Sequence, residues 1–255
     1  MVHETAIVSK SATLGKNVSV GAFAIIDGDV EIGDNCEIAP RVHLLDGVRM
    51  GAGNYIGEGT LIGDKAQDLK FKGGRSFVKI GDNNTIREYV TIHRSNTEGK
   101  ETVIGSDNFI MTMAHIAHDC VIGNNIIIVN WAGLTGHIEV HDNAFISGLT
   151  AIHQHVRIGK HSMTAGGIKV SQDIVPYTMV GGYPARSIGL NKVGLKRSGF
   201  DAKKIKLLSD AYRIIFRSKT TLKEALAEVE KSVEQVEEVK YFVEFIKGSK
   251  RGITR

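Results

Sequence analysis

Residues 18–63 read VSVGAFAIIDGDVEIGDNCEIAPRVHLLDGVRMGAGNYIGEGTLIG, and an aliphatic side chain or methionine recurs at every sixth position from Val20 to Ile62. Glycine often follows this residue, as in Ile32-Gly33, and a small or β-branched residue usually stands two positions before it. An α-helix repeats every 3.6 residues and a half-buried strand every two, so neither produces this period. A period of six suits a short strand followed by a tight turn.

The same period continues through most of the chain. It stops across 64–79, resumes at Ile80, stops again near 95–102 and then runs on from Ile104. Such hexads are typical of parallel β-helices, in which each coil buries its apolar ladder only by stacking on its neighbours. We therefore expect an all-β parallel β-helix of roughly eight or nine coils over residues 1–190. The two interruptions are predicted to be loops that leave it, and long loops are often functional.

The apolar spacing changes near the C-terminus. Apolar residues now recur at intervals of three and four, the spacing of an amphipathic helix: Ile205, Leu208, Tyr212 and Ile215. Thr221 followed by Glu224 has the pattern of a capping box that opens a second helix. A third apolar stripe ends before Gly248, a typical helix stop. We expect a small C-terminal α-helical domain of about three helices over residues 191–255.

The composition narrows the class of protein. The 255 residues are 42% apolar and 24% charged, which excludes a disordered chain, and they include only two cysteines. Cys36 and Cys120 occupy the small buried position of a hexad, so we expect packing residues rather than reactive thiols. No apolar run approaches the roughly 18 residues that cross a bilayer, and the N-terminus lacks a signal-peptide profile. We expect a cytoplasmic protein.

The charge is unevenly distributed. Residues 192–255 contain 16 Lys and Arg against 9 Asp and Glu, whereas the rest of the chain has a net charge of −3. A basic segment on a mildly acidic body attracts nucleic acid, membrane headgroups or an acidic protein. The segment has no aromatic stacking platform and no reading motif, which disfavours nucleic acid. The charge alone does not choose among the remaining partners.

Several of the ten histidines fall into register when three hexads make one coil. Residues three hexads apart then lie one above the other on adjacent coils, about 5 Å apart. Two such columns gather proton-carrying side chains on one part of the surface, where the repeat itself needs none. The first column is His118, Gly136 and Gln154, and the second is Asp119, His137 and His155, with His115 and His153 nearby.

Three interpretations of these residues compete. They are exposed strand positions that tolerate histidine, or His115 and His118 bind zinc as in β-helical carbonic anhydrases, or His118 is a general base. Imidazole titrates near neutrality, so it can take the proton of an alcohol that attacks a carbonyl. Asp119 can fix its tautomer, and the Gly136 amide across the coil gap can donate to a developing oxyanion. A glycine there also lets a substrate approach the backbone closely.

A resemblance becomes specific at these residues. The chain resembles the UDP-N-acetylglucosamine acyltransferases of the hexapeptide-repeat family over its whole length, on six segments in the right order and spacing: QDLK (67–70), IHR (92–94), AHIAHDC (114–120), GH (136–137), HQ (153–154) and GLKRSGF (194–200). The resemblance implies that the β-helix is left-handed, against the general preference for right-handed crossovers. It also implies transfer of an (R)-3-hydroxyacyl chain from acyl carrier protein to the 3-hydroxyl of UDP-N-acetylglucosamine, the first step of lipid A synthesis.

The resemblance also implies a role for each matching residue. His118 would be the base, Asp119 its orienting partner and the Gly136 backbone the oxyanion donor. The substrate would be held by sugar-contacting residues and by residues serving the nucleotide: Asp68, His137 and Gln154 with Lys70 nearby, and His115, His153, Asn191 and Arg197. The acyl chain would run past Gly148, Gly166 and Lys169. The family's site lies between subunits of a homotrimer, and it needs neither a cofactor nor a metal.

The resemblance gives the basic segment a preferred partner and leaves rivals. Acyl carrier protein is acidic, and seven cations are candidates to steer it: Lys196, Arg197, Lys203, Lys204, Lys206, Arg213 and Arg217. Val193, Ser198 and Pro184 depart from common family residues, which raises the alternative of a sugar with a 3-amino group. The other rivals are a related N-acyltransferase or acetyltransferase, a metal-dependent hydratase and a non-catalytic scaffold.

Overall fold

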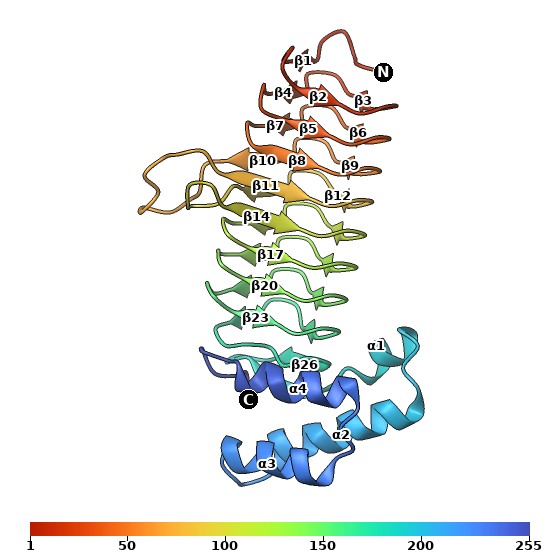
Figure 1. Ribbon diagram of the computed structural model, residues 1–255, viewed down its shortest axis with the longest axis vertical. Coiled ribbons are helices and arrows are strands. Elements are labelled where there is room, and N and C mark those ends of the chain that lie inside the picture. Colours follow the sequence, from red (N-terminus) through yellow and green to blue (C-terminus); the bar gives the residue numbers. More distant parts are fainter.

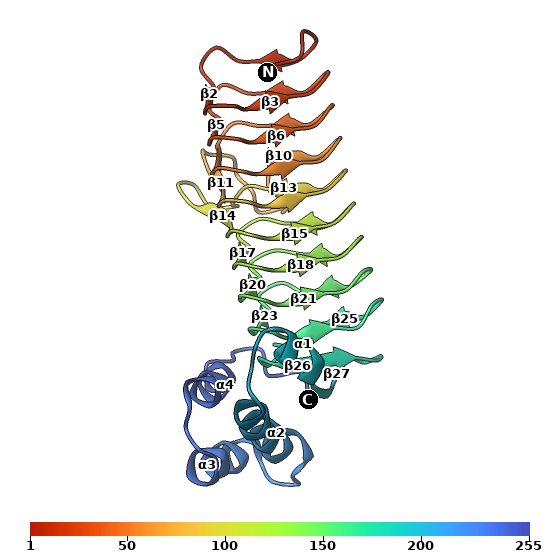
Figure 2. The ribbon, with the colours of Figure 1, turned by 90° about the vertical axis from the view of Figure 1, so that its right-hand side faces the viewer.

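The structure, a computed structural model, describes all 255 residues and has the form of a long three-sided prism with helices at its C-terminal end (Figure 1). Each rung contributes one short strand to each of three sheets, and successive rungs stack along the long axis (Figure 2). Strands within each stack are parallel except for the last pair, β26 and β27. The left-handed parallel β-helix with a small helical part is thus confirmed.

The three sheets are named A, B and C. Sheet B contains nine strands: β1 (Ile7–Val8), β4 (Ile25–Ile26), β7 (His43–Leu44), β10 (Leu61–Asp64), β13 (Thr91–His93), β16 (His115–Ile116), β19 (Gly133–Leu134), β22 (Ala151–Ile152) and β25 (Lys169–Val170). Sheet C contains eight: β2 (Thr13–Leu14), β5 (Glu31–Ile32), β8 (Val48–Met50), β11 (Phe77–Ile80), β14 (Glu101–Ile104), β17 (Val121–Ile122), β20 (Glu139–Val140) and β23 (Arg157–Ile158). Sheet A contains ten: β3 (Ser19–Val20), β6 (Glu37–Ile38), β9 (Tyr55–Ile56), β12 (Thr85–Ile86), β15 (Phe109–Ile110), β18 (Ile127–Ile128), β21 (Phe145–Ile146), β24 (Met163–Thr164), β26 (Thr178–Gly181) and β27 (Arg186–Leu190).

The strand register records the two interruptions of the repeat. Most partners lie three hexads apart in the sequence, as His115 and Gly133 do. Leu61 instead pairs with Thr91, five hexads on, and Thr91 pairs with His115, four hexads on. The first loop therefore inserts two hexads and the second inserts one. Because both insertions are whole numbers of hexads, the aliphatic ladder continues in frame after each of them.

The loops are shorter than the broken hexad pattern predicts. Asp64 and residues 77–79 and 101–102 were expected in loops but belong to strands β10, β11 and β14. They are strand because β11 pairs with both β8 and β14 on the neighbouring rungs, and backbone pairing does not need the hexad side chains. The segments that leave the prism are 65–76 and 94–100, and in Figure 1 both project from the side that carries β10 and β11.

The hexad side chains fill the prism. A single cluster of 41 buried apolar residues runs through it, and both cysteines are among them, as predicted. Inside three consecutive rungs the small position holds asparagine instead, and the Asn54 carboxamide oxygen accepts from the Asn84 side chain at 2.9 Å. The Asn108 backbone N–H in turn donates to Asn84 at 3.0 Å. These amides are buried but hydrogen-bonded, which removes most of the cost of their burial.

The C-terminal part contains four helices rather than about three: α1 (Lys192–Arg197), α2 (Ala202–Arg217), α3 (Leu222–Ser232) and α4 (Glu237–Lys247). Helix α1 was missed because it is too short to show a helical apolar period. The capping box of Thr221 and Glu224 is present, and Gly248 caps α4. None of the four helices combines the length and the hydropathy that a bilayer-spanning helix requires.

The end of the chain returns to the prism. The Tyr241 hydroxyl on α4 lies 2.7 Å from His141 Nδ1 next to sheet C. After α4, Ile253 forms a parallel bridge with Asp173 on the last rungs. The segment between, 248–252, is therefore held against the end of sheet C.

Candidate active site

His118 lies at the corner between sheets B and C, in the turn that joins β16 to β17. Its side chain is almost fully buried, and its Nδ1 lies 2.7 Å from Asp119 Oδ2. Asp119 has a left-handed backbone (φ 59°), which Asp tolerates better than most residues, and its N–H donates to Thr102 Oγ1 at 2.8 Å. The turn therefore presents a histidine with a carboxylate on one ring nitrogen and the other ring nitrogen free for chemistry.

The Asp119 carboxylate is held by the loop 94–100. The Ser95 hydroxyl donates a hydrogen bond to Oδ1, and the Asn96 backbone N–H donates to Oδ2 at 3.0 Å. Burial alone would raise the pKa of Asp119, but the hydrogen bonds from Ser95, His118 and Asn96 outweigh it and keep the pKa below its usual value. Asp119 is therefore a carboxylate at neutral pH and favours the tautomer in which His118 Nδ1 carries the proton.

The loop 65–76 brings a second carboxylate to the other ring nitrogen. Asp68 Oδ2 accepts from the Asn96 carboxamide at 2.8 Å and lies 4.0 Å from His118 Nε2. The two insertions thus contact each other above the same corner. Lys70, in the same loop, is exposed, and only its backbone N–H is bonded, to Asp68.

Gly136 lies on the next rung, directly over His118. A Cβ atom on Gly136 would stand 3.0 Å from the Cε1 and Nε2 atoms of the His118 ring. Its φ of 112° is open only to glycine. Its N–H donates to no backbone oxygen of the chain, and it lies close enough to the buried Cys120 thiol to lower the pKa of that group, against the larger effect of burial. The Gly136 main chain therefore lies against the imidazole of His118 across the coil gap, with no room for a side chain between them.

The second column is also assembled as predicted. The His137 ring meets that of His118 edge-on at 5.1 Å and stacks on His155 at 4.6 Å. His137 Nε2 lies 3.8 Å from Asp119 Oδ2. Burial lowers the pKa of His137 and Asp119 opposes the shift, so His137 is neutral at neutral pH.

His115 is next to the corner but faces another group. Its Nδ1 is 2.7 Å from the Thr91 hydroxyl, and its ring meets that of the buried His93 at 5.3 Å. Burial, with smaller contributions from His93 and His118, lowers the pKa of His115 to about 4. The side chains that bring one ligand atom each within 4.8 Å of one another are His118, Asp119 and His137. The group contains His118 but not His115, so these two residues do not form the predicted pair of zinc ligands.

Asn191 and Arg197 are not brought to this corner. They line a cleft of about 520 Å³ on sheet A, which also includes Val193 and Ser198. Sheet A is the side of the prism opposite the B–C corner, and Figure 1 shows α1 and the loops on opposite sides. The Asn191 side chain caps α1 by accepting from the Gly194 N–H at 3.1 Å. One chain therefore divides the predicted substrate residues between two separate surfaces.

The other predicted substrate residues lie at two different corners of the prism or on sheet B. His153 and Gln154 lie at the B–C corner one rung beyond Gly136, and His153 is exposed. Gly148 and Gly166 stack at the A–B corner, where the N–H of Gly167 donates to Gly148 O at 2.9 Å. Lys169 is exposed on β25.

Comparisons with known proteins match this architecture over the whole chain. Hexapeptide-repeat models match residues 11–45, 29–64 and 101–136, and the model of UDP N-acetylglucosamine O-acyltransferase, domain 2, matches residues 173–254. An acyl-[acyl-carrier-protein]–UDP-N-acetylglucosamine O-acyltransferase from Thermodesulfovibrio yellowstonii is 48% identical over 255 residues, 100% of this chain and 99% of the relative. The chain belongs to the UDP-N-acetylglucosamine O-acyltransferase family.

Solved structures of this family have the same fold. A UDP-N-acetylglucosamine acyltransferase from Bacteroides fragilis superposes with a TM-score of 0.98 at 42% identity, and all of both chains is covered. One from Arabidopsis gives a TM-score of 0.90 at 37% identity, again over 100% of both chains. The resemblance that the six motifs indicated is therefore confirmed.

Several residues that build the site are not indicated by the hexad register. Ser95 and Asn96 hold Asp119, and Thr102 fixes its backbone. Each lies in or beside the second interruption, where the register of three hexads does not apply. A register of four hexads, which the insertion requires, would have placed Ser95 beside Asp119.

Proposed function

We propose that this protein transfers an (R)-3-hydroxyacyl chain from the thioester of acyl carrier protein to the 3-hydroxyl of UDP-N-acetylglucosamine, the first step of lipid A biosynthesis. One observation supports this most directly: the buried His118 is held by Asp119 on one ring nitrogen, and the Gly136 main chain lies against the edge of the ring that carries the other. Relatives that carry this activity in their names match the chain from end to end. The protein is an acyltransferase in this proposal.

The reaction needs a base for the alcohol and a donor for the oxyanion. His118 Nε2 takes the proton of the sugar hydroxyl while its oxygen forms a bond to the thioester carbonyl carbon. The carbonyl oxygen becomes an oxyanion, and the Gly136 N–H donates to it. The C–S bond then breaks, and the imidazolium returns its proton to the departing sulfur. The products are the sugar ester and the free thiol.

The charge carried by His118 during this cycle is matched by Asp119. The carboxylate accepts the Nδ1–H in both states and stabilises the imidazolium without taking its proton. No thiol or serine takes part: Cys120 is buried, and burial raises its pKa to about 12. A direct transfer without an acyl-enzyme therefore suits the corner.

The sugar is held at the same corner in this proposal. Asp68, His137 and Gln154 contact its hydroxyl and acetamido groups, with Lys70 at the mouth of the site. Asp68 and His137 both lie next to the His118 ring: Asp68 Oδ2 is 4.0 Å from Nε2, and the centre of the His137 ring is 5.1 Å from that of His118. Hydrogen bonds from both residues would orient the attacking oxygen.

The nucleotide and acyl residues imply a site between subunits. Asn191 and Arg197 lie on sheet A and Gly148, Gly166 and Lys169 at the A–B side, away from His118. A homotrimer in which side A of one chain faces the B–C corner of the next would unite them. In that arrangement His115 and His153 serve the nucleotide from the catalytic chain, and Arg197 binds its phosphates from the neighbour.

An acyl-transfer assay tests the proposal. The purified protein is incubated with UDP-N-acetylglucosamine and a series of (R)-3-hydroxyacyl carrier proteins of increasing chain length, and ester formation is measured. We expect one chain length to give the highest kcat/KM. A parallel assay with the 3-amino sugar nucleotide decides the acceptor: a preference for the amine would contradict ester transfer. Acetyl-CoA as the better donor would favour the acetyltransferase alternative.

One observation favours a second candidate. His118, Asp119 and His137 offer three ligand atoms within 4.8 Å, a geometry that a divalent metal accepts. A metal-dependent hydratase is therefore the alternative function. Stoichiometric zinc in the purified protein, with activity lost to a chelator, would support the hydratase. Full acyl-transfer activity after chelation supports the general-base mechanism.

A further inference from the structure

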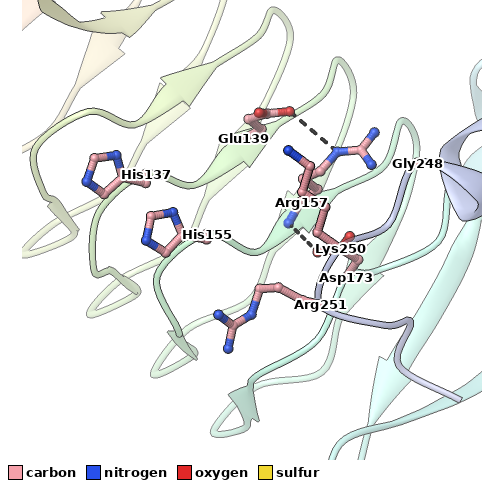
Figure 3. A pocket seen from close by; sticks show the side chains of 8 residues that line it. All are labelled: His137, Glu139, His155, Arg157, Asp173, Gly248, Lys250 and Arg251. Carbon is pink, nitrogen blue, oxygen red and sulfur yellow. Dashed lines mark hydrogen bonds and ion pairs between the residues drawn. The ribbon is translucent and has the colours of Figure 1, made fainter.

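A polar groove begins at the reaction corner and runs along the end of sheet C. It encloses about 690 Å³, and none of the residues that line it has an apolar side chain. Figure 3 shows His137 and His155 at one end, and Arg157, Lys250 and Arg251 around the other. The lining suits a charged ligand and not an acyl chain.

The first end of the groove belongs to the catalytic corner. His137 is edge-on to His118, and its Nε2 is 3.8 Å from Asp119. His155 stacks on His137 one rung further along. A ligand in the groove therefore has one end beside the atoms that would react.

The other end carries three cations, and the fold leaves most of the hydrogen-bonding capacity of two of them unused. Lys250 has no carboxylate or hydrogen-bond partner in the chain. Arg251 makes one side-chain hydrogen bond, from its Nε to Ser171 O at 3.1 Å, and its two terminal guanidinium nitrogens remain free. Arg157 stacks over the Phe245 ring at 4.2 Å. Two of the three guanidinium and ammonium groups are available to an anion.

The chain fixes these cations in position. Asp173 is buried, and its carboxylate accepts from the Arg157 backbone N–H at 2.9 Å and from the Ser249 hydroxyl at 2.8 Å. Its backbone bonds Gly252 and Thr254, which holds the segment that carries Lys250 and Arg251. Asp173 is thus occupied by the fold, and Glu139, 3.5 Å from Arg157, is the only acidic side chain of the groove that faces a cation.

The basic helix α2 has less free charge than its sequence suggests. Lys203 pairs with Glu234 and Lys204 with Glu238. Lys206 and Arg213 both pair with Asp210. Four of the seven cations predicted to attract the acidic partner are therefore partly neutralised within the chain, whereas Lys250 and Arg251 stand unpaired beside the groove.

We propose that this groove binds the phosphodiester of the prosthetic arm that carries the acyl thioester. The inference rests on the proposed function. The arm must leave the reaction corner towards its carrier protein, and the groove spans the two rungs from His137 to Asp173, about 10 Å at about 4.8 Å per rung. Arg251 and Lys250 supply the charge-assisted hydrogen bonds that a phosphate needs. The diphosphate of the sugar nucleotide is the other phosphate group that these two cations could bind.

Kinetics of the double variant Lys250→Gln/Arg251→Gln test the inference with three donors: the acyl carrier protein thioester, the acyl phosphopantetheine and the acyl pantetheine without phosphate. We expect KM to rise at least tenfold for the two donors that carry phosphate, and to stay unchanged for the pantetheine thioester and for UDP-N-acetylglucosamine. Arg255→Gln, which removes a charge from the same segment outside the groove, is the matched control and should change nothing. Equal thermal melting of the three proteins checks the fold.

Three results would overturn the inference. A raised KM for the sugar nucleotide alone would assign the groove to the acceptor diphosphate. An effect confined to the protein-bound donor would indicate a protein–protein contact instead of a phosphodiester site. Unchanged kinetics with every donor would show that the groove binds neither. If the unaltered protein transfers no acyl group at all, it is the proposed function that fails, so the two failures are distinguishable.

Discussion

Gly136 packs its main chain against the imidazole of His118, the residue three hexads earlier. A Cβ atom at Gly136 would lie 3.0 Å from both Cε1 and Nε2 of that ring. The contact follows from the length of the coil. The strand register pairs His115 with Gly133, so three residues later in the following turns His118 and Gly136 are also stacked on adjacent rungs. A repeat that exists for packing thereby brings the His118 imidazole and the Gly136 main chain together.

Replacing Gly136 with alanine should damage catalysis. The methyl group would press on the His118 ring, and the φ of 112° is unfavourable for any residue with a Cβ. We expect kcat to fall about a hundredfold or more, because the misplaced main chain moves both the His118 ring and the residue 136 N–H away from the oxyanion. Gly133→Ala is the matched control, since a Cβ there meets nothing within 4 Å. Steady-state kinetics check this, and equal losses in both variants would contradict it.

Asp119→Asn should lower kcat with little change in KM for the sugar nucleotide. The amide keeps the size of the carboxylate but loses the charge that stabilises the His118 imidazolium and fixes its tautomer. We expect a loss of about a hundredfold or more in kcat. The pH dependence of kcat is the second readout, because a residue with a purely structural role would leave it unchanged. An unchanged pH profile and unchanged kcat would assign Asp119 a purely structural role.

His115 should make the fold less stable in acid. Its folded pKa is lowered to about 4, so an unfolded chain, with a pKa of about 6.5, binds the proton first as the pH falls. The free energy of unfolding therefore decreases from about pH 6.5 to about pH 4, by about 2 kcal/mol after allowance for partial exposure.

Urea unfolding at pH 7 and pH 5 measures this effect. In His115→Gln the decrease in unfolding free energy between the two pH values should be smaller than in the unaltered protein. The comparison isolates His115 from His137, His141 and His161, whose pKa values are also lowered by burial. Identical decreases in both proteins would contradict the assignment.

A site shared between chains predicts complementation. His118→Ala removes the base of one surface and Arg197→Ala the phosphate ligand of the other. We expect each variant to be impaired alone, and a mixture unfolded and refolded together to regain a fraction of the activity, because mixed trimers contain one intact pair of surfaces. Sedimentation should give three chains per particle. A mixture no more active than its components would contradict the shared site.

The fold was predictable because the residues that pack in the core recur at a fixed interval of six in the sequence. Every sixth residue enters the core, so the chain from Val20 to Ile62 specifies a coil without any long-range information. The exception is α1, a short helix that depends on the Asn191 cap and on contact with sheet A. Neither is visible as periodicity.

Site residues could be predicted only where adjacent rungs are three hexads apart in the sequence. His118, Gly136 and the column of Asp119, His137 and His155 follow from a spacing of three hexads. Ser95 and Asn96 do not, because the insertion that contains them changes the spacing to four hexads. The groove is also invisible in the sequence, since Arg251 reaches sheet C only after four helices return the chain to the prism.

The kinetics of His118→Ala in the acyl carrier protein-dependent transfer assay are the sharpest test of general-base catalysis at this corner. We predict that kcat falls by at least about a hundredfold to a thousandfold, the usual scale for a lost general base, with the melting temperature preserved. A variant that folds normally and keeps kcat near that of the unaltered protein would contradict the assignment of His118 as the base.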